Sequence, residues 1–144
     1  MRRIVLAIAF ALLAGTAAQA QRFDSGWRRI AVNDLADLDL WGGDVRVNNL
    51  IVAAENETNA RAQPEKLATH VFSLSAVKRA PGSRNVFVQL VGMNADRIPT
   101  MTSIIAVNFG DSDINRLRTD THRFIAFPKE VATTREYFVR ILVQ

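Results

Sequence analysis

Between residues 21 and 144 apolar and polar residues alternate in short stretches, and turn-forming residues separate the stretches. Alternation with a period of two indicates strands with one face in a core and one face in solvent. The pattern predicts about seven or eight strands spaced about ten residues apart, and no amphipathic helix of three turns. The expected strands are 28–32, 37–41, 44–54, 70–78, 85–93, 101–109, 122–127 and 136–143.

Many short strands at even spacing are typical of an all-β fold. We expect one β-sandwich domain over residues 21–144, immunoglobulin-like in topology, with a small β-barrel as the alternative. The stretch from Asn85 to Met93 is apolar on both faces, which predicts a central strand. We expect it to form an antiparallel hairpin with 70–78 around the turn Ala80–Ser83, and residues 55–66 to form the longest loop.

The front of the chain has a different pattern. Arg2 and Arg3 precede an unbroken apolar run of 11 residues, Ile4 to Ala14, and Ala18-Gln19-Ala20 supplies the small residues of a cleavage site. This order is typical of a secretory signal peptide, and the run is too short for a membrane span, which needs about 20 residues. Residues 1–20 are therefore predicted to be cleaved near Ala20, which places the mature chain in the periplasm or outside the cell.

Composition narrows the possible functions. The chain has 18 basic and 14 acidic residues, and without Arg2 and Arg3 the excess of positive charge is only two. This balance argues against nucleic-acid binding. The absence of cysteine excludes disulfides, thiolate nucleophiles and cysteine metal sites. No segment after the signal peptide has the length and hydropathy of a membrane span, so we predict none.

A possible binding site surrounds Trp41. An exposed aromatic ring can stack on the face of a sugar, and nearby amides and carboxylates can bind its hydroxyl groups. Trp41 with Asp44, Asn48 and Asn49 has this composition, and Trp27 is a second tryptophan that could take part. These residues are the predicted ligand-binding set for the hypothesis of carbohydrate binding.

Catalytic and metal-binding patterns are weak. His70 and His122 are the two histidines, and neither belongs to a metal-binding or catalytic spacing, so a small hydrolase that uses one of them is a minor alternative. Asp111 to Asn115 begins like a calcium-binding loop, but Arg116 and His122 occupy the positions that should hold glycine and glutamate. We predict no catalytic residue, no metal site and no cofactor.

The last segments, with Phe124, Phe127-Pro128 and Tyr137 to Ile141, are loosely similar to the final two strands of bacterial immunoglobulin-like modules. The similarity covers about 20 residues and implies no functional residue. The leading hypothesis is an exported, non-catalytic module of the cell envelope or exterior that binds a protein partner or a surface polymer. An unpaired apolar edge, such as the last strand, would favour binding by strand addition.

Overall fold

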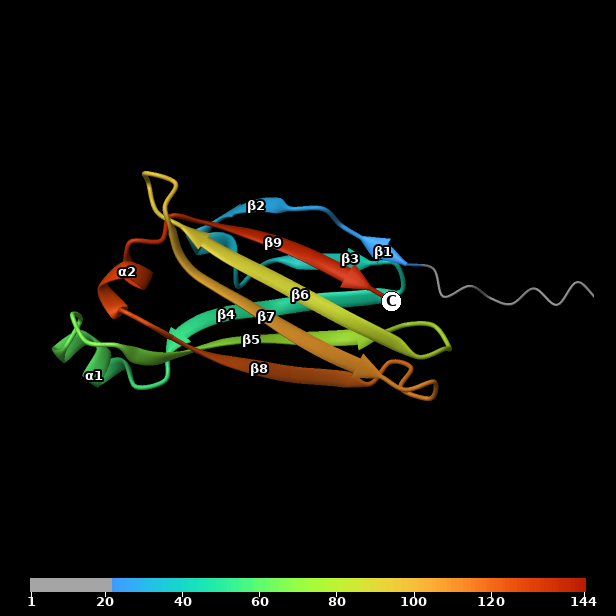
Figure 1. Ribbon diagram of the computed structural model, residues 1–144. Helices are drawn as coiled ribbons and strands as arrows, with labels where there is room; N and C mark the ends of the chain where they lie inside the picture. Colours follow the sequence, from blue (N-terminus) through green and yellow to red (C-terminus); the bar gives the residue numbers. More distant parts are fainter. Residues whose placement is uncertain (1–21) are drawn as a thin grey trace, which may run out of the picture.

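The computed structural model describes residues 22–144, and the predicted signal peptide and its cleavage site lie outside them. The described chain is all-β: two antiparallel sheets of five and four strands pack as a sandwich (Figure 1). The strands are β1 (Phe23–Asp24), β2 (Arg28–Ala31), β3 (Asp39–Gly42), β4 (Val45–Ala54), β5 (Ala68–Lys78), β6 (Arg84–Met93), β7 (Pro99–Phe109), β8 (Leu117–Ala126) and β9 (Glu136–Val143).

The five-stranded sheet has the order β1-β9-β6-β7, and β2 also pairs with β9 on the β1 side. Strand β6 is central, as its two apolar faces predicted. One of these faces is fully buried against the other sheet and carries Val86, Val88 and Leu90. In β9 the alternate residues from Tyr137 to Val143 join the same core. Burial of these side chains is the main source of cohesion.

The four-stranded sheet has the order β3-β4-β5-β8. Val45, Val47, Phe72 and Leu74 fill its inner face and complete a single hydrophobic core with the five-stranded sheet. The β4–β5 register shifts between Asn48 and Ile51, so Asn48-Asn49 forms a bulge in β4. Such a bulge bends the strand and increases its twist.

Two expectations about pairing are wrong. Strands β5 and β6 do not form a hairpin: β5 pairs with β4 and β8, while β6 pairs with β7 and β9 in the other sheet. The turn at Ala80–Ser83 therefore carries the chain between the two layers. The last strand is also no edge, because β9 is hydrogen-bonded on both sides. Local alternation reports which face is buried, but it does not report which strand lies beside it.

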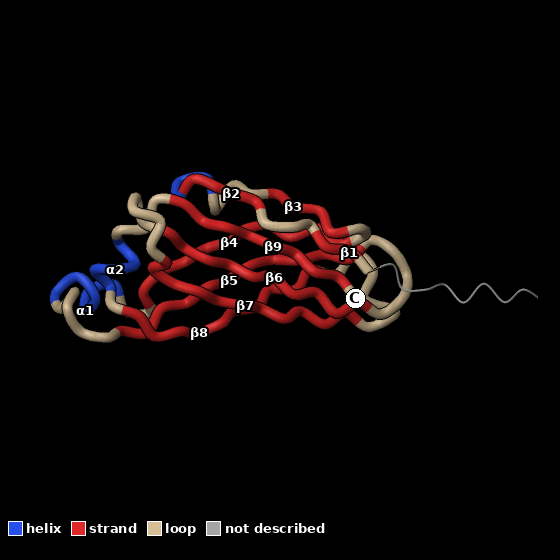
Figure 2. The backbone as a smooth tube through the Cα atoms, turned by 45° about the horizontal axis from the view of Figure 1, so that its top comes forward, coloured by secondary structure: helices blue, strands red, loops and turns tan. Residues whose placement is uncertain are grey.

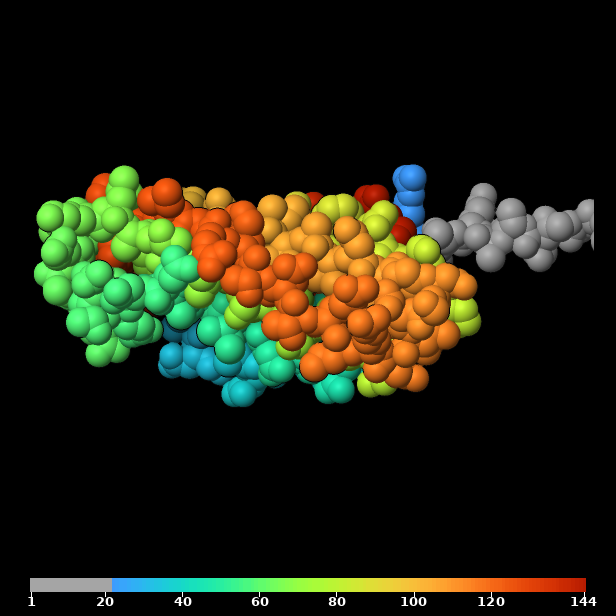
Figure 3. Space-filling view, turned by 90° about the horizontal axis from the view of Figure 1, so that it is seen from below, coloured from blue at the N-terminus to red at the C-terminus, as the bar shows by residue number. Residues whose placement is uncertain are grey.

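The expected long loop contains helix α1 (Glu57–Ala62), whose first turn is capped by the side chain of Asn56. Helix α2 (Pro128–Ala132) joins β8 to β9, and a 3-10 turn, Val32–Asp34, follows β2. Both α-helices lie at one end of the sandwich (Figure 2). Strand β8 begins at Leu117, five residues before the expected start at His122. The polar residues of 117–121 concealed this start, because β8 is exposed along most of its length (Figure 3).

Candidate functional site

Trp41 lies on the outer face of the four-stranded sheet. It belongs to the edge strand β3, in which Leu40 and Gly42 point inward while Trp41 keeps 48% of its surface exposed. Its cross-strand neighbour is Arg46, which makes two hydrogen bonds to the carboxylate of Asp39 at 2.7 and 2.8 Å. This ring is therefore available to a ligand and is bordered by an ion pair.

The charges beside Trp41 are fixed by that ion pair. The hydrogen bond from Arg46 lowers the pKa of Asp39, and the same contact raises the pKa of Arg46. Both groups therefore stay ionised at neutral pH.

The other predicted ligand-binding residues take different positions. Asn48 pairs with Asp39 across β3 and β4 and lies on the same outer face as Trp41. Asn49 is exposed at the bulge, in the left-handed region with φ 52°. Asp44 is partly buried, and its Oδ1 accepts a hydrogen bond of 3.2 Å from Nε of Arg84 in the other sheet. Asp44 thus links the two sheets, while the structure brings Trp41 and Asn48 together.

The two histidines have different partners. His70 is 2% exposed, stacks on Phe124 with ring centroids 5.5 Å apart, and shares a hydrogen bond of 3.1 Å with the carbonyl of Ala68. His122 points inward from β8, and its Nδ1 lies 2.8 Å from the hydroxyl of Ser103 in β7. His70 is thus part of the packing, whereas His122 forms a contact between the sheets.

The contact of Ser103 with His122 was not predicted, since 19 residues separate the two. A serine beside a histidine can act as a nucleophile and its base when a third group orients the histidine. Within residues 22–144, no carboxylate is hydrogen-bonded to either histidine. Ser103 is buried, whereas His122 is exposed on the edge strand β8.

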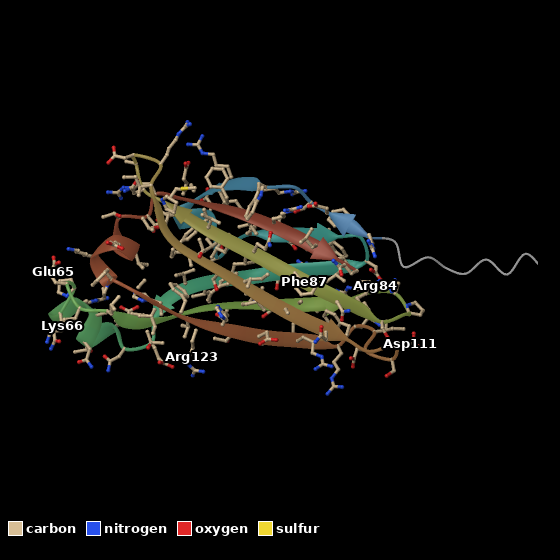
Figure 4. All side chains as sticks on the ribbon, viewed as in Figure 1. Glu65, Lys66, Arg84, Phe87, Asp111 and Arg123 are labelled. Carbon is tan, nitrogen blue, oxygen red and sulfur yellow. The ribbon has the colours of Figure 1, made fainter. Side chains whose placement is uncertain are left out.

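The loop from Asp111 to Asn115 is built around cations of the protein itself. The ammonium of Lys78 is fully buried and donates hydrogen bonds to the carbonyls of Gly82, Gly110 and Asp111 at 2.5, 2.6 and 3.1 Å. Arg84 and Asp111 mark this end of the sandwich in Figure 4, opposite the helices. A buried ammonium needs such a full set of acceptors.

Two arginines contact the carboxylate of Asp113, the second aspartate of the same loop. Arg118 donates to Oδ2 of Asp113 at 2.8 Å, and Arg116 lies 3.3 Å from Oδ1. These contacts, with the backbone N–H of Gly110, lower the pKa of Asp113 to about 2. The sequence that resembles the start of a calcium loop therefore forms a turn held by Lys78 and two arginines.

The outer face of the five-stranded sheet is unexpectedly apolar. Its residues come from β6, β7 and β9 together with the segment before β2, and Phe87 is labelled on it in Figure 4. We call this surface the apolar face and define it by Trp27, Phe87, Val91, Ile104, Phe138 and Leu142. The sequence signal for this face is that β6 and β9 carry apolar residues on both sides. Burial in the core accounts for only one of those sides.

Trp27 and Ile104 are the most exposed members of the apolar face, at 49% and 44%. The guanidinium of Arg140 lies 5.9 Å from the ring centroid of Trp27, within the range of a cation–π contact. A shallow depression crosses the face between Trp27 and Ile104 and is also lined by Gln89. The Oε1 atom of Gln89 is buried there, and no group of the described chain hydrogen-bonds it.

In the part of the chain that the structure describes, no helix is long and apolar enough to cross a membrane. The sequence matches no known family of proteins, and no characterised protein is detectably similar to it.

Proposed function

We propose that this chain is an exported, non-catalytic β-sandwich module of the cell envelope or exterior, and that it binds a protein partner through the apolar face. Exposed apolar patches of several hundred Å² on a folded protein commonly mark interaction sites. The predicted signal peptide supports a periplasmic or secreted location. The observation that carries the proposal is the exposure of Trp27 and Ile104 on a sheet face that would be polar if it met only water.

The chemistry of this face fits a protein partner. Tryptophan and arginine are enriched among the residues that dominate binding energy at protein interfaces. Trp27 and Arg140 are in contact here, and the aromatic rings of Phe87 and Phe138 lie on the same face.

A capture experiment tests the proposal. The tagged protein is incubated with envelope extract, and recovered proteins are compared between the unchanged chain, Ile104→Glu and Ile51→Glu. Ile51 is a matched control, because it is 49% exposed on the outer face of the other sheet. We expect Ile104→Glu to abolish recovery and Ile51→Glu to retain it. Equal recovery with both variants would contradict the proposal.

A second candidate function, carbohydrate binding, is favoured by the position of Trp41. The ring is exposed on a sheet face beside the amide of Asn48, an arrangement that suits stacking on a sugar. Polysaccharide retardation in native gels tests it: Trp41→Ala should abolish retardation, while Trp27→Ala, on the opposite outer face, should not. Retardation by neither the unchanged chain nor its variants would leave the apolar face as the better explanation.

A hydrolase that uses His70 or His122 has less support. His70 is enclosed by its packing, and His122 has Ser103 as its hydrogen-bond partner instead of a carboxylate. Turnover of an ester substrate that is lost in Ser103→Ala and retained in Ser73→Ala would nevertheless establish it.

The immunoglobulin-like topology is the finer part of the fold prediction and stays a prediction. Two stacked antiparallel sheets support it. The strand order β3-β4-β5-β8 and the position of β9 beside β6 are the features to compare with solved immunoglobulin-like domains.

A further inference from the structure

The apolar face is continuous across three neighbouring strands. Phe87 is the direct cross-strand neighbour of Leu142, and Val91 is that of Phe138. On the other side of β6, Ile104 of β7 is directly opposite Gln89. Directly opposed residues have Cβ atoms about 4.5–5.5 Å apart, so these side chains form one surface, in which Gln89 and Arg140 are a polar pair between the two apolar pairs.

The charges on this face cancel, both at Arg140 in its middle and at Arg29 near its end. Arg140 makes two hydrogen bonds to the carboxylate of Asp24, at 2.5 and 2.9 Å, and Arg29 pairs with Glu136. The face thus carries two positive and two negative groups, each satisfied within the same chain. A strongly acidic or basic partner would gain little here, whereas a second copy of the same face would meet no net like charge.

The size of the face suits a dimer. Strand β6 has ten residues, and with β7, β9 and β1 or β2 the sheet is four strands wide. Strands β7 and β9 have 11 and 8 residues, and β1 and β2 have 2 and 4. At about 3.4 Å per residue and about 4.8 Å between strands, the sheet area is about 570 Å². This area is of the same order as the roughly 800 Å² that each partner buries in an interface of standard size.

We propose that the apolar face packs against the same face of a second copy of this chain in an isologous, two-fold symmetric dimer. Two sheets stacked face to face at about 10 Å would bury Trp27, Phe87 and Ile104 of both copies. This inference rests on the proposed function, since it names the partner of the same surface.

The test is the mass of the purified protein as a function of concentration, by light scattering and sedimentation, with the N terminus identified by mass spectrometry. We expect a monomer–dimer equilibrium. Ala106→Glu places a carboxylate opposite Phe87 at an exposed position, and it should weaken the dimer at least tenfold. Ile51→Glu, on the other outer face, should leave the dissociation constant unchanged.

Trp27→Ala is a second variant. It removes an exposed ring from a segment outside the strands, and unlike Ala106→Glu it adds no charge. It too should weaken the dimer, with an unchanged circular dichroism spectrum. A monomer at every concentration would overturn the inference, as would a dimer disrupted by Ile51→Glu but not by Ala106→Glu. Binding of the monomer to lipid vesicles would assign the face to a membrane surface instead.

The two proposals fail separately. A monomer that still captures another protein through Ile104 would refute the second copy and leave the proposed function standing. A dimer whose face variants change no capture would support self-association and would remove the role of this face in binding other proteins.

Discussion

The two sheets share one kind of inner face and differ in their outer faces. Inside, Leu90 of the five-stranded sheet and Leu74 of the four-stranded sheet are both within 1% of complete burial. Outside, β6 presents Phe87 and Val91, whereas β5 presents Val71, Ser73 and Val77 and carries no aromatic ring on that face. The inner faces are therefore explained by folding alone, while the aromatic rings of Trp27, Phe87 and Phe138 on the outer face of the five-stranded sheet are what we assign to binding.

The largest expected effect concerns the shared inner faces. Leu90→Ala and Leu74→Ala should each lower the free energy of unfolding by about 2–5 kcal/mol, because each leaves a cavity in a closed core. Urea denaturation measures both. The outer-face variants Ile104→Ala and Ile51→Ala should stay within about 0.5 kcal/mol of the unchanged chain at concentrations where it is monomeric. If one of the two leucine substitutions lowered the free energy of unfolding much less than the other, the two inner faces would not be equivalent.

The buried ammonium of Lys78, at the end of β5, can be compared with the exposed side chain of Arg79 next to it. Lys78→Met should lower the free energy of unfolding by about 3 kcal/mol, because it leaves three carbonyl groups without their donor. Amide hydrogen exchange should become faster in residues 110–116. Arg79→Met is the control, since Arg79 is exposed and reaches the same loop only through Asn115. Equal effects of the two substitutions would disprove the special role of Lys78.

The outer face of the five-stranded sheet contains a polar atom that is not satisfied. Gln89→Met removes the buried Oε1 and keeps the shape of the side chain, so it should raise the free energy of unfolding by about 1 kcal/mol. Thermal unfolding at one fixed protein concentration checks this. The exposed Gln63→Met should have no such effect, and destabilisation by Gln89→Met would indicate a hydrogen bond of Gln89 that is important for folding.

The smallest effect compares the carboxylate of Asp24, in β1, with that of Asp113, in the loop before β8. Hydrogen bonds from Arg140 and from the N–H of Gly26 lower the pKa of Asp24 to about 2 from its usual 3.8, and Arg118 acts in the same way on Asp113. A folded-state pKa below the unfolded value adds stability above about pH 4, and this stability is lost as the pH falls towards 2.

Asp24→Asn and Asp113→Asn should therefore flatten the dependence of the unfolding midpoint on pH between about 4 and 2. Asp96→Asn, in the exposed turn between β6 and β7, is the control and should leave that dependence as it is. If neither Asp24→Asn nor Asp113→Asn changed that dependence, the contacts of Arg140 and Arg118 with these carboxylates would be too weak to affect acid unfolding.

Much of the fold was predictable from alternation alone. The strand class and the central position of β6 followed from the spacing of apolar residues. The partner of β5 did not, because a turn such as Ala80–Ser83 can connect strands within one sheet or between two. Pairing depends on long-range packing, and no local pattern encodes it.

The candidate sites show the same division. Residues Trp41 and Asn48 are close in sequence, and alternation places them on one outer face. Ser103 is 19 residues from His122, and two acceptors of Lys78, the carbonyls of Gly110 and Asp111, are 32 and 33 residues from it, so only the folded chain brings these groups together. The contact of Asp44 with Arg84 of the other sheet likewise has no signal in the local pattern.

The central position of β9 has a consequence for the order in which the chain can fold. Strands β1 and β2 form ladders with β9 alone, and β9 is synthesised more than a hundred residues after them. A nascent chain that lacks residues 136–143 therefore leaves its first strands without a partner, and the five-stranded layer stays open. Assembly of that layer must wait for the end of synthesis, which suits a polypeptide that is predicted to pass through a membrane before it folds.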